Sequence, residues 1–86
     1  MLKIQRIEEG EYSVFALSGR IEAENLKQLK SLLKAERQPV MLDLREVSLV
    51  AREVVSFLAR CQEDDIGLRN CPAYVREWIA GERGEK

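Results

Sequence analysis

Histidine is absent from this 86-residue chain, and cysteine occurs only 2 times. Without histidine, the chain lacks the commonest general base and the commonest metal ligand of proteins. Two cysteines alone do not supply the four ligands of an ordinary zinc site, and they are too few for the disulfide framework of a small secreted domain. The sequence therefore predicts no metal and no cofactor, and it favours a reducing, cytoplasmic location.

Long apolar runs and an excess of one charge are also missing. No uninterrupted apolar stretch approaches the roughly 20 residues that cross a bilayer, and the alternating, charged start of the chain lacks the apolar region of a signal peptide. The chain has 14 basic and 15 acidic side chains, for a net charge of -1, whereas nucleic-acid binders normally carry a basic excess. We therefore expect no membrane insertion and no nucleic-acid partner.

The motifs of nucleotide-binding and catalytic proteins are not found in the sequence. Its glycines do not have the spacing of a phosphate-binding loop, and a nucleophile has no histidine with which to pair. Glu22 and Glu24 lie two residues apart on a predicted helix, so they point in different directions and do not form a catalytic pair of carboxylates. An enzyme is therefore the least favoured class.

The composition is typical of one small folded domain. Hydrophobic residues make up 45% of the chain and charged residues 34%. A disordered chain would have fewer apolar residues or a larger net charge. A chain of this length rarely divides into separate domains. We interpret residues 1–81 as a single domain and residues 82–86 as a frayed tail.

The spacing of apolar residues predicts elements in the order β-β-α-β-α-β-α. Alternation with period 2 indicates the first strands and helical spacing indicates the helices. We expect strands over about residues 2–8, 12–18, 40–44 and 66–69, and helices over 22–36, 50–62 and from Pro72. The prediction is an α/β fold with a small single sheet of about four strands, mixed with a parallel core, and with helices mainly on one face. Leu42, in the middle of the short apolar strand, should lie in the core.

Three features of the sequence each have two interpretations. Cys61 and Cys71 should be separated by the length of a strand, roughly 13–17 Å, which favours two reduced thiols, with Cys61 in the core, over a redox pair. Tyr74 and Trp78 can touch on the last helix, either as packing residues or as an exposed aromatic binding patch. The basic residues of the first helix form either a solvated face or a site for an acidic partner: Lys27, Lys30, Lys34 and Arg37.

Three stretches of the chain resemble the STAS domain of the anti-anti-sigma factor family. Residues 15–21, FALSGRI, look like the second strand of that family and its following L-x-G-x-L/I turn. Residues 41–50, MLDLREVSLV, look like the segment before its functional loop, and residues 68–75, LRNCPAYV, look like its last strand and the entry to a helix. The resemblance runs through nearly the whole chain. It implies a STAS-like fold and a non-enzymatic interaction module, an anti-sigma factor antagonist of the bacterial cytoplasm.

The chain departs from that family at the site of regulation. Where such proteins usually carry Asp-Ser-Ser/Thr-Gly, this chain has Ala51-Arg52-Glu53-Val54, and Glu53 takes the position of the residue that an anti-sigma kinase phosphorylates. A carboxylate carries a single negative charge and a phosphoserine about −1.5 to −2. Glu53 is therefore either an imperfect mimic or only a favourable charge at the start of a helix. The resemblance implies a divergent member that is not controlled by phosphorylation at the usual site.

The resemblance also implies a docking surface for a protein partner, either an anti-sigma factor of the kinase type or another regulatory protein. That surface would combine a loop over 48–54, the exposed side of the helix after it and a turn over 19–22. The expected partner-binding residues are Gly19, Arg20, Glu22, Ser48, Ala51, Arg52 and Glu53. Apolar spacing turns Val54, Phe57 and Leu58 inward and leaves Arg52 and Glu53 exposed. Two alternatives stay open: a regulatory subunit of a transport or signalling complex, and a small-ligand or nucleotide sensor.

Overall fold

The structure, a computed structural model, describes residues 2–82. Its elements are β1 (Leu2–Glu9), β2 (Tyr12–Ile21), the 3-10 helix η1 (Ala23–Asn25), α1 (Leu26–Ala35), β3 (Val40–Val50), α2 (Arg52–Glu63), β4 (Gly67–Arg69) and α3 (Ala73–Glu82). The four strands form one sheet in the order β1-β2-β3-β4. β1 is antiparallel to β2, and the other neighbours are parallel. The predicted α/β fold with a single mixed sheet is confirmed.

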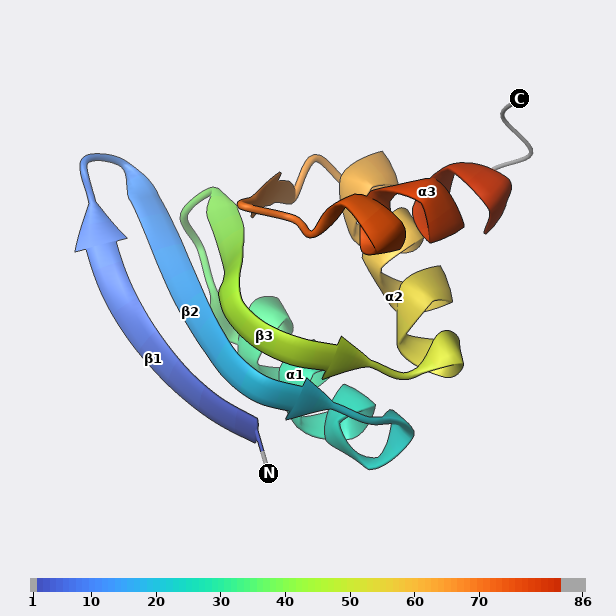
Figure 1. The fold of residues 1–86 in the computed structure, drawn as a ribbon. Helices are drawn as coiled ribbons and strands as arrows, with labels where there is room; N and C mark the ends of the chain where they lie inside the picture. Colours follow the sequence, from blue (N-terminus) through green and yellow to red (C-terminus); the bar gives the residue numbers. More distant parts are fainter. Residues whose placement is uncertain (1, 83–86) are drawn as a thin grey trace.

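One apolar cluster holds the sheet and the three helices together. Phe15 pairs with Leu42, which pairs in turn with Leu68, and residues paired across neighbouring strands share a face of the sheet. Leu42 has a relative exposure of 0%, as its predicted place in the core requires. Helices α1, α2 and α3 all contribute side chains to the same cluster, including Leu29, Leu58 and Ile79. Figure 1 shows α1 behind the sheet, and α3 packed beside α2.

The opposite face of the sheet is open and more polar. Residues of three strands line a groove of about 460 Å³, among them Lys3, Gln5, Ser18 and Glu46, whose side chains lie on this face. Such an alternation of apolar and polar side chains is expected when only one face of a sheet is covered.

Strands β2 and β3 are both longer than their predicted ranges. Beyond Ala16 they continue to pair, with Ser18 opposite Glu46 and Ile21 opposite Val50, after two shifts of register. Gly19 lies at the second shift with φ 94, in a region of backbone conformation that glycine adopts without steric cost. The extension was missed because the added part of β3 is mostly exposed, so it lacks the apolar run that marks a buried strand.

The helices begin and end close to their predicted positions. The first begins with the 3-10 turn η1, where the backbone N–H of Glu22 donates to Asn25 Oδ1 over 2.8 Å. Helix α2 begins at Arg52 and not at Val50, because Val50 is paired with β2. Helix α3 follows Pro72 and continues through Glu82, the first residue of the predicted tail. Residues 83–86 lie outside the described part of the chain.

Candidate functional site: the α2–α3 surface

The two segments predicted to form a docking surface do lie together. Arg20 pairs with Leu49 and Ile21 with Val50, and the backbone N–H of Ala51 donates to the carbonyl oxygen of Ile21 over 2.9 Å. The two segments therefore meet because β2 and β3 are parallel neighbours whose carboxyl ends reach the same edge of the sheet. Ligand and partner sites of α/β folds commonly form at this edge.

The predicted loop and turn are, however, mostly strand. Ser48 belongs to β3, Gly19 and Arg20 belong to β2, and only Ala51 separates β3 from α2. Gly19 pairs with Val47 and Arg20 with Leu49, whereas Ser48 lies at the register shift between these two pairs. Glu22 is held differently, since its N–H is bonded to Asn25 at the start of η1. The structure thus has mostly strand where the sequence predicted a loop over 48–54 and a turn over 19–22.

The first turn of α2 projects Arg52 and Glu53 into solvent, as the apolar spacing predicts. Val54 has a relative exposure of 0% and Leu58 also 0%, while Phe57 is half-buried. Ala51 is the N-cap residue of this helix, and its methyl group cannot accept a hydrogen bond as a serine or aspartate would. The negative charge of Glu53 is favourable beside the positive end of the helix dipole.

A groove lies between the start of α2 and the end of α3. It has a volume of about 400 Å³ and is lined by Arg52, Val55, Glu77, Trp78, Gly81 and Glu82. The hydroxyl of Ser56 on α2 donates to Glu82 Oε1 on α3 and links the two helices beside the groove. Arg52 is therefore the predicted site residue that extends from the edge of the sheet into a concave surface.

Two aromatic side chains of α3 lie in contact here: Trp78 lines the groove and Tyr74 packs against Trp78. The rings of Tyr74 and Trp78 meet edge to face, with centroids 5.6 Å apart and an interplanar angle of 85°. Tyr74 is 38% exposed and Trp78 47%, whereas Val75 and Ile79 turn inward and are buried. The two rings therefore contact each other and stay partly exposed, as the interpretation of an exposed aromatic patch requires, and binding at this patch stays a prediction. We call the groove residues together with Tyr74 the α2–α3 surface.

Sequence reasoning did not assign α3 to the docking surface, although a usable signal was present. The spacing of Val75 and Ile79 marks a buried stripe, and Tyr74 and Trp78 each precede a member of it by one residue, which rotates them away from the core. The spacing within α3 does not predict that this outer side of the helix lies next to the first turn of α2. Packing of α3 against α2 decides that proximity.

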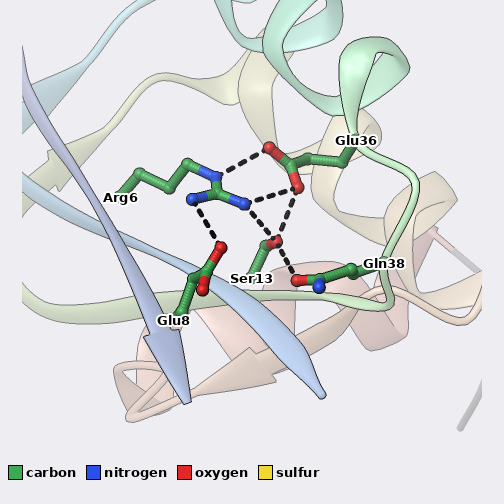
Figure 2. Close-up of polar contacts among 5 residues, drawn as sticks. All are labelled: Arg6, Glu8, Ser13, Glu36 and Gln38. Atoms are coloured by element: carbon green, nitrogen blue, oxygen red, sulfur yellow. Dashed lines mark hydrogen bonds and ion pairs between the residues drawn. The ribbon is translucent and has the colours of Figure 1, made fainter. Parts of the chain in front are cut away.

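A second polar cluster lies at the other end of the sheet (Figure 2). Ser13 is completely buried; its hydroxyl accepts a hydrogen bond from Arg6 Nη2 at 3.0 Å and donates to Glu36 Oε1 at 2.5 Å. Arg6 Nε also donates to Glu36 Oε2 at 2.8 Å. These bonds from Arg6 and Ser13 lower the pKa of Glu36. The cluster includes Glu8 and Gln38 as further partners.

This cluster is built for structure and not for catalysis. A nucleophilic serine must reach its substrate and needs a base strong enough to take its proton. Ser13 is inaccessible, and the lowered pKa makes Glu36 a weak base. The cluster instead ties the β1–β2 hairpin to the end of α1, across 23 to 30 positions of the sequence.

The two thiols and the acidic residues offer no other reactive centre in the described chain. Cys61 and Cys71 are free; burial raises the pKa of Cys61 to about 12 and also raises that of Cys71, so neither is an activated thiolate. Within residues 2–82, no three His, Cys, Asp or Glu side chains are placed to hold a metal ion. No helix in that range is both long and apolar enough to cross a membrane.

In comparisons with known proteins, no family model and no curated protein matches the chain.

Proposed function

We propose that this chain is a STAS-like interaction module that acts without catalysis as an anti-sigma factor antagonist in the cytoplasm. The observation that carries the proposal is the exposed pair of Tyr74 and Trp78 beside the groove that Arg52 lines. Tryptophan, tyrosine and arginine are the side chains most enriched among the residues that dominate protein–protein binding energy. Two large aromatic side chains exposed next to each other form an apolar patch, and exposed apolar patches often mark interaction sites.

The charges of the α2–α3 surface support recognition of a partner in one orientation. Arg52 lines the groove opposite two acidic side chains, Glu77 and Glu82. A surface that carries both signs around an aromatic centre favours a partner with the complementary arrangement and disfavours others. The proposed partner is an anti-sigma factor of the kinase type or another regulatory protein.

The first turn of α2 supports docking that is not switched by phosphorylation. Phosphorylation adds a charge of about −1.5 to −2 where a hydroxyl stands, and Ala51, Arg52 and Glu53 provide no hydroxyl. Glu53 is exposed at this turn and carries its charge permanently. Binding should therefore be constitutive or controlled at another level, such as synthesis of the chain.

The experiment is a direct binding measurement with the kinase-type anti-sigma factors of the source organism. Calorimetry measures affinity, and the fluorescence of Trp78 reports its burial, because the chain contains 1 Trp. Binding at the α2–α3 surface should shift this emission to shorter wavelength. Arg52→Glu should weaken binding by roughly tenfold or more if Arg52 is one of the dominant residues, with a change in folding free energy under about 0.5 kcal/mol.

Lys34→Glu is the matched control, because it reverses an exposed positive charge on α1. If Lys34→Glu weakens binding while Arg52→Glu does not, the basic face of α1 is the docking surface. If no anti-sigma factor binds and a nucleotide alone raises the melting temperature, the chain is a ligand sensor and the proposal is wrong.

A further inference from the structure

Within residues 2–82, one backbone edge of strand β1 pairs with no other strand. The strand lies at one end of the strand order and pairs with β2 over all eight residues, without a register shift. Figure 1 shows β1 at the rim of the sheet, on the side away from α2 and α3. Natural edge strands are commonly shortened, bulged or interrupted by proline, which prevents pairing with another chain. The segment LKIQRIEE has no proline and no bulge, but it carries charged side chains, which can also prevent pairing unless the second strand supplies the opposite charges: Lys3, Arg6, Glu8 and Glu9.

The hydrogen bonding of β2 identifies the backbone groups on that edge. The N–H of Ser13 points toward β3, since it donates to the carbonyl oxygen of Pro39 over 2.9 Å. Successive N–H groups of a strand point in opposite directions, so Val14 faces β1 and its partner Ile7 is bonded inward. The outward N–H and C=O groups of β1 therefore belong to Arg6 and Glu8, and to the other even-numbered residues.

We infer that β1 pairs antiparallel with β1 of a second copy of this chain, about a two-fold axis that passes between the two Ile7 residues. In this register, the outward groups of Arg6 meet those of Glu8 in the second copy, and the reverse pair forms on the other side of the axis. Residues that oppose one another across a two-fold axis normal to the sheet share a face. Because side chains alternate between the two faces along a strand, two opposed residues must both have odd numbers or both have even numbers. The Ile7 pair, the Arg6–Glu8 pairs and the Gln5–Glu9 pairs all meet this condition.

Charge selects this register among its neighbours. Directly opposed residues of opposite charge stabilise a sheet and like charges destabilise it. With Ile7 on the axis, both Arg6–Glu8 pairs are attractive and no like charges face each other. The neighbouring register that opposes Lys3 to Glu9 places Arg6 against Arg6, which is repulsive.

The side chains have the capacity for these contacts. The guanidinium of Arg6 has five N–H donors, and its bonds to Glu8, Ser13 and Glu36 within the described chain use four of them. The side chain of Glu8 is 62% exposed. On the other face of the strand, Ile7 is a large apolar side chain with 38% exposure, which pairing with a second Ile7 would reduce.

Pairing through β1 leaves the α2–α3 surface uncovered, because α2 and α3 lie away from the β1 edge of the sheet (Figure 1). The inference is therefore independent of the proposed function. A second copy of the chain is the partner that fits this edge, because the charges of the edge are complementary to themselves.

Sedimentation equilibrium over a series of protein concentrations tests the dimer. Glu8→Arg replaces both attractive pairs by repulsive ones and should raise the dissociation constant of the dimer roughly tenfold. Arg6→Glu should do the same. An equimolar mixture of the two variants restores opposite charges at both pairs, so it should form a heterodimer although neither variant forms a homodimer. A wild type that is monomeric at every concentration, or a dimer that Glu8→Arg leaves intact, overturns the inference.

Cross-linking provides a second measurement if Arg6→Glu fails to fold. Ile7→Cys in a Cys71→Ser background places a thiol on the axis, where opposed Cα atoms lie about 4.5 Å apart, within the range of a disulfide. Mild oxidation should give a covalent dimer. Lys3→Cys is the control, since it is an exposed residue of the same strand and face that has no strand partner in this register. Equal cross-linking of the two variants would overturn the inference.

Discussion

Glu9 and Arg69 form a bidentate ion pair between the two edge strands of the sheet, although β2 and β3 lie between them. Arg69 Nη2 donates to Glu9 Oε1 at 3.0 Å and Nη1 to Oε2 at 3.1 Å. The residues are 60 positions apart in the sequence, and each ends its strand. Their strand registers place both side chains on the open face, which also carries Val14, 1% exposed. The pair therefore crosses the sheet on the side that the helices leave uncovered.

Acid should weaken the fold through these paired carboxyl groups. The hydrogen bond from Arg69 lowers the pKa of Glu9 below its ordinary 4.5, and the bonds from Arg6 and Ser13 likewise lower the pKa of Glu36. In each case the unfolded chain takes up the proton first as pH falls, so the stabilisation is present above pH 4.5 and is lost through the lowered pKa. Urea unfolding can be measured at a series of pH values from neutral to pH 3. The urea concentration at the midpoint should decrease once the pH is below about 4.5.

Glu9→Gln tests how much the Glu9–Arg69 ion pair contributes to stability. The variant should be less stable than the wild type at neutral pH and should lose less stability on acidification, because its share of the proton linkage is gone. Glu11→Gln, in the adjacent hairpin turn, is the control for the change in net charge. An acid profile for Glu9→Gln that is parallel to that of the wild type would contradict the assignment.

Leu42→Ala should destabilise the domain by about 2–5 kcal/mol, because it opens a cavity at a fully buried position. The matched control is Leu49→Ala on the same strand, where the side chain is 46% exposed. That control should change the free energy of unfolding by under about 0.5 kcal/mol. Chemical denaturation monitored by Trp78 fluorescence measures both. If the two variants lose similar free energies of unfolding, Leu42 is not more buried than Leu49 and the orientation of β3 is wrong.

Ser13→Ala should cost about 1–3 kcal/mol, because it removes the hydrogen bonds that a buried hydroxyl makes with two charged side chains, Arg6 and Glu36. Ser56→Ala is its control, since Ser56 also donates to a glutamate but on an exposed part of α2. The loss at Ser56 should be under about 0.5 kcal/mol. Equal melting temperatures for Ser13→Ala and the wild type would show that the polar cluster adds nothing to the hairpin.

No phosphate should be transferred to the first turn of α2. Incubation with a kinase-type anti-sigma factor and ATP, followed by intact-mass analysis, should leave the mass of the chain unchanged, because residues 51–53 carry no hydroxyl. Ser48 and Ser56 are the nearest hydroxyl residues; Ser48 lies within β3 at a shift of register, and Ser56 lies within α2. Stoichiometric phosphate on either serine would show that the switch has moved.

Local sequence patterns account for the types of the elements and for which side of each is buried. The alternation along β2, the apolar run through Leu42 and the spacing of Val54 and Leu58 each place side chains that the structure buries. Those patterns depend on the backbone geometry of a single strand or helix, which has the same period wherever the element packs. The order of the strands also follows from short connections between neighbouring elements.

Contacts between distant elements needed the tertiary structure. The pairing of Ile21 with Val50 converts a predicted loop into strand, packing of α3 against α2 brings Trp78 to the groove that Arg52 lines, and the bonds from Arg6 to Glu36 and from Arg69 to Glu9 join residues 30 and 60 positions apart. In each case the sequence alone determined a side chain's chemistry and its face within an element. Its neighbour was decided by how whole elements pack, since burying the shared apolar cluster sets their relative positions and the polar contacts form where that packing places them.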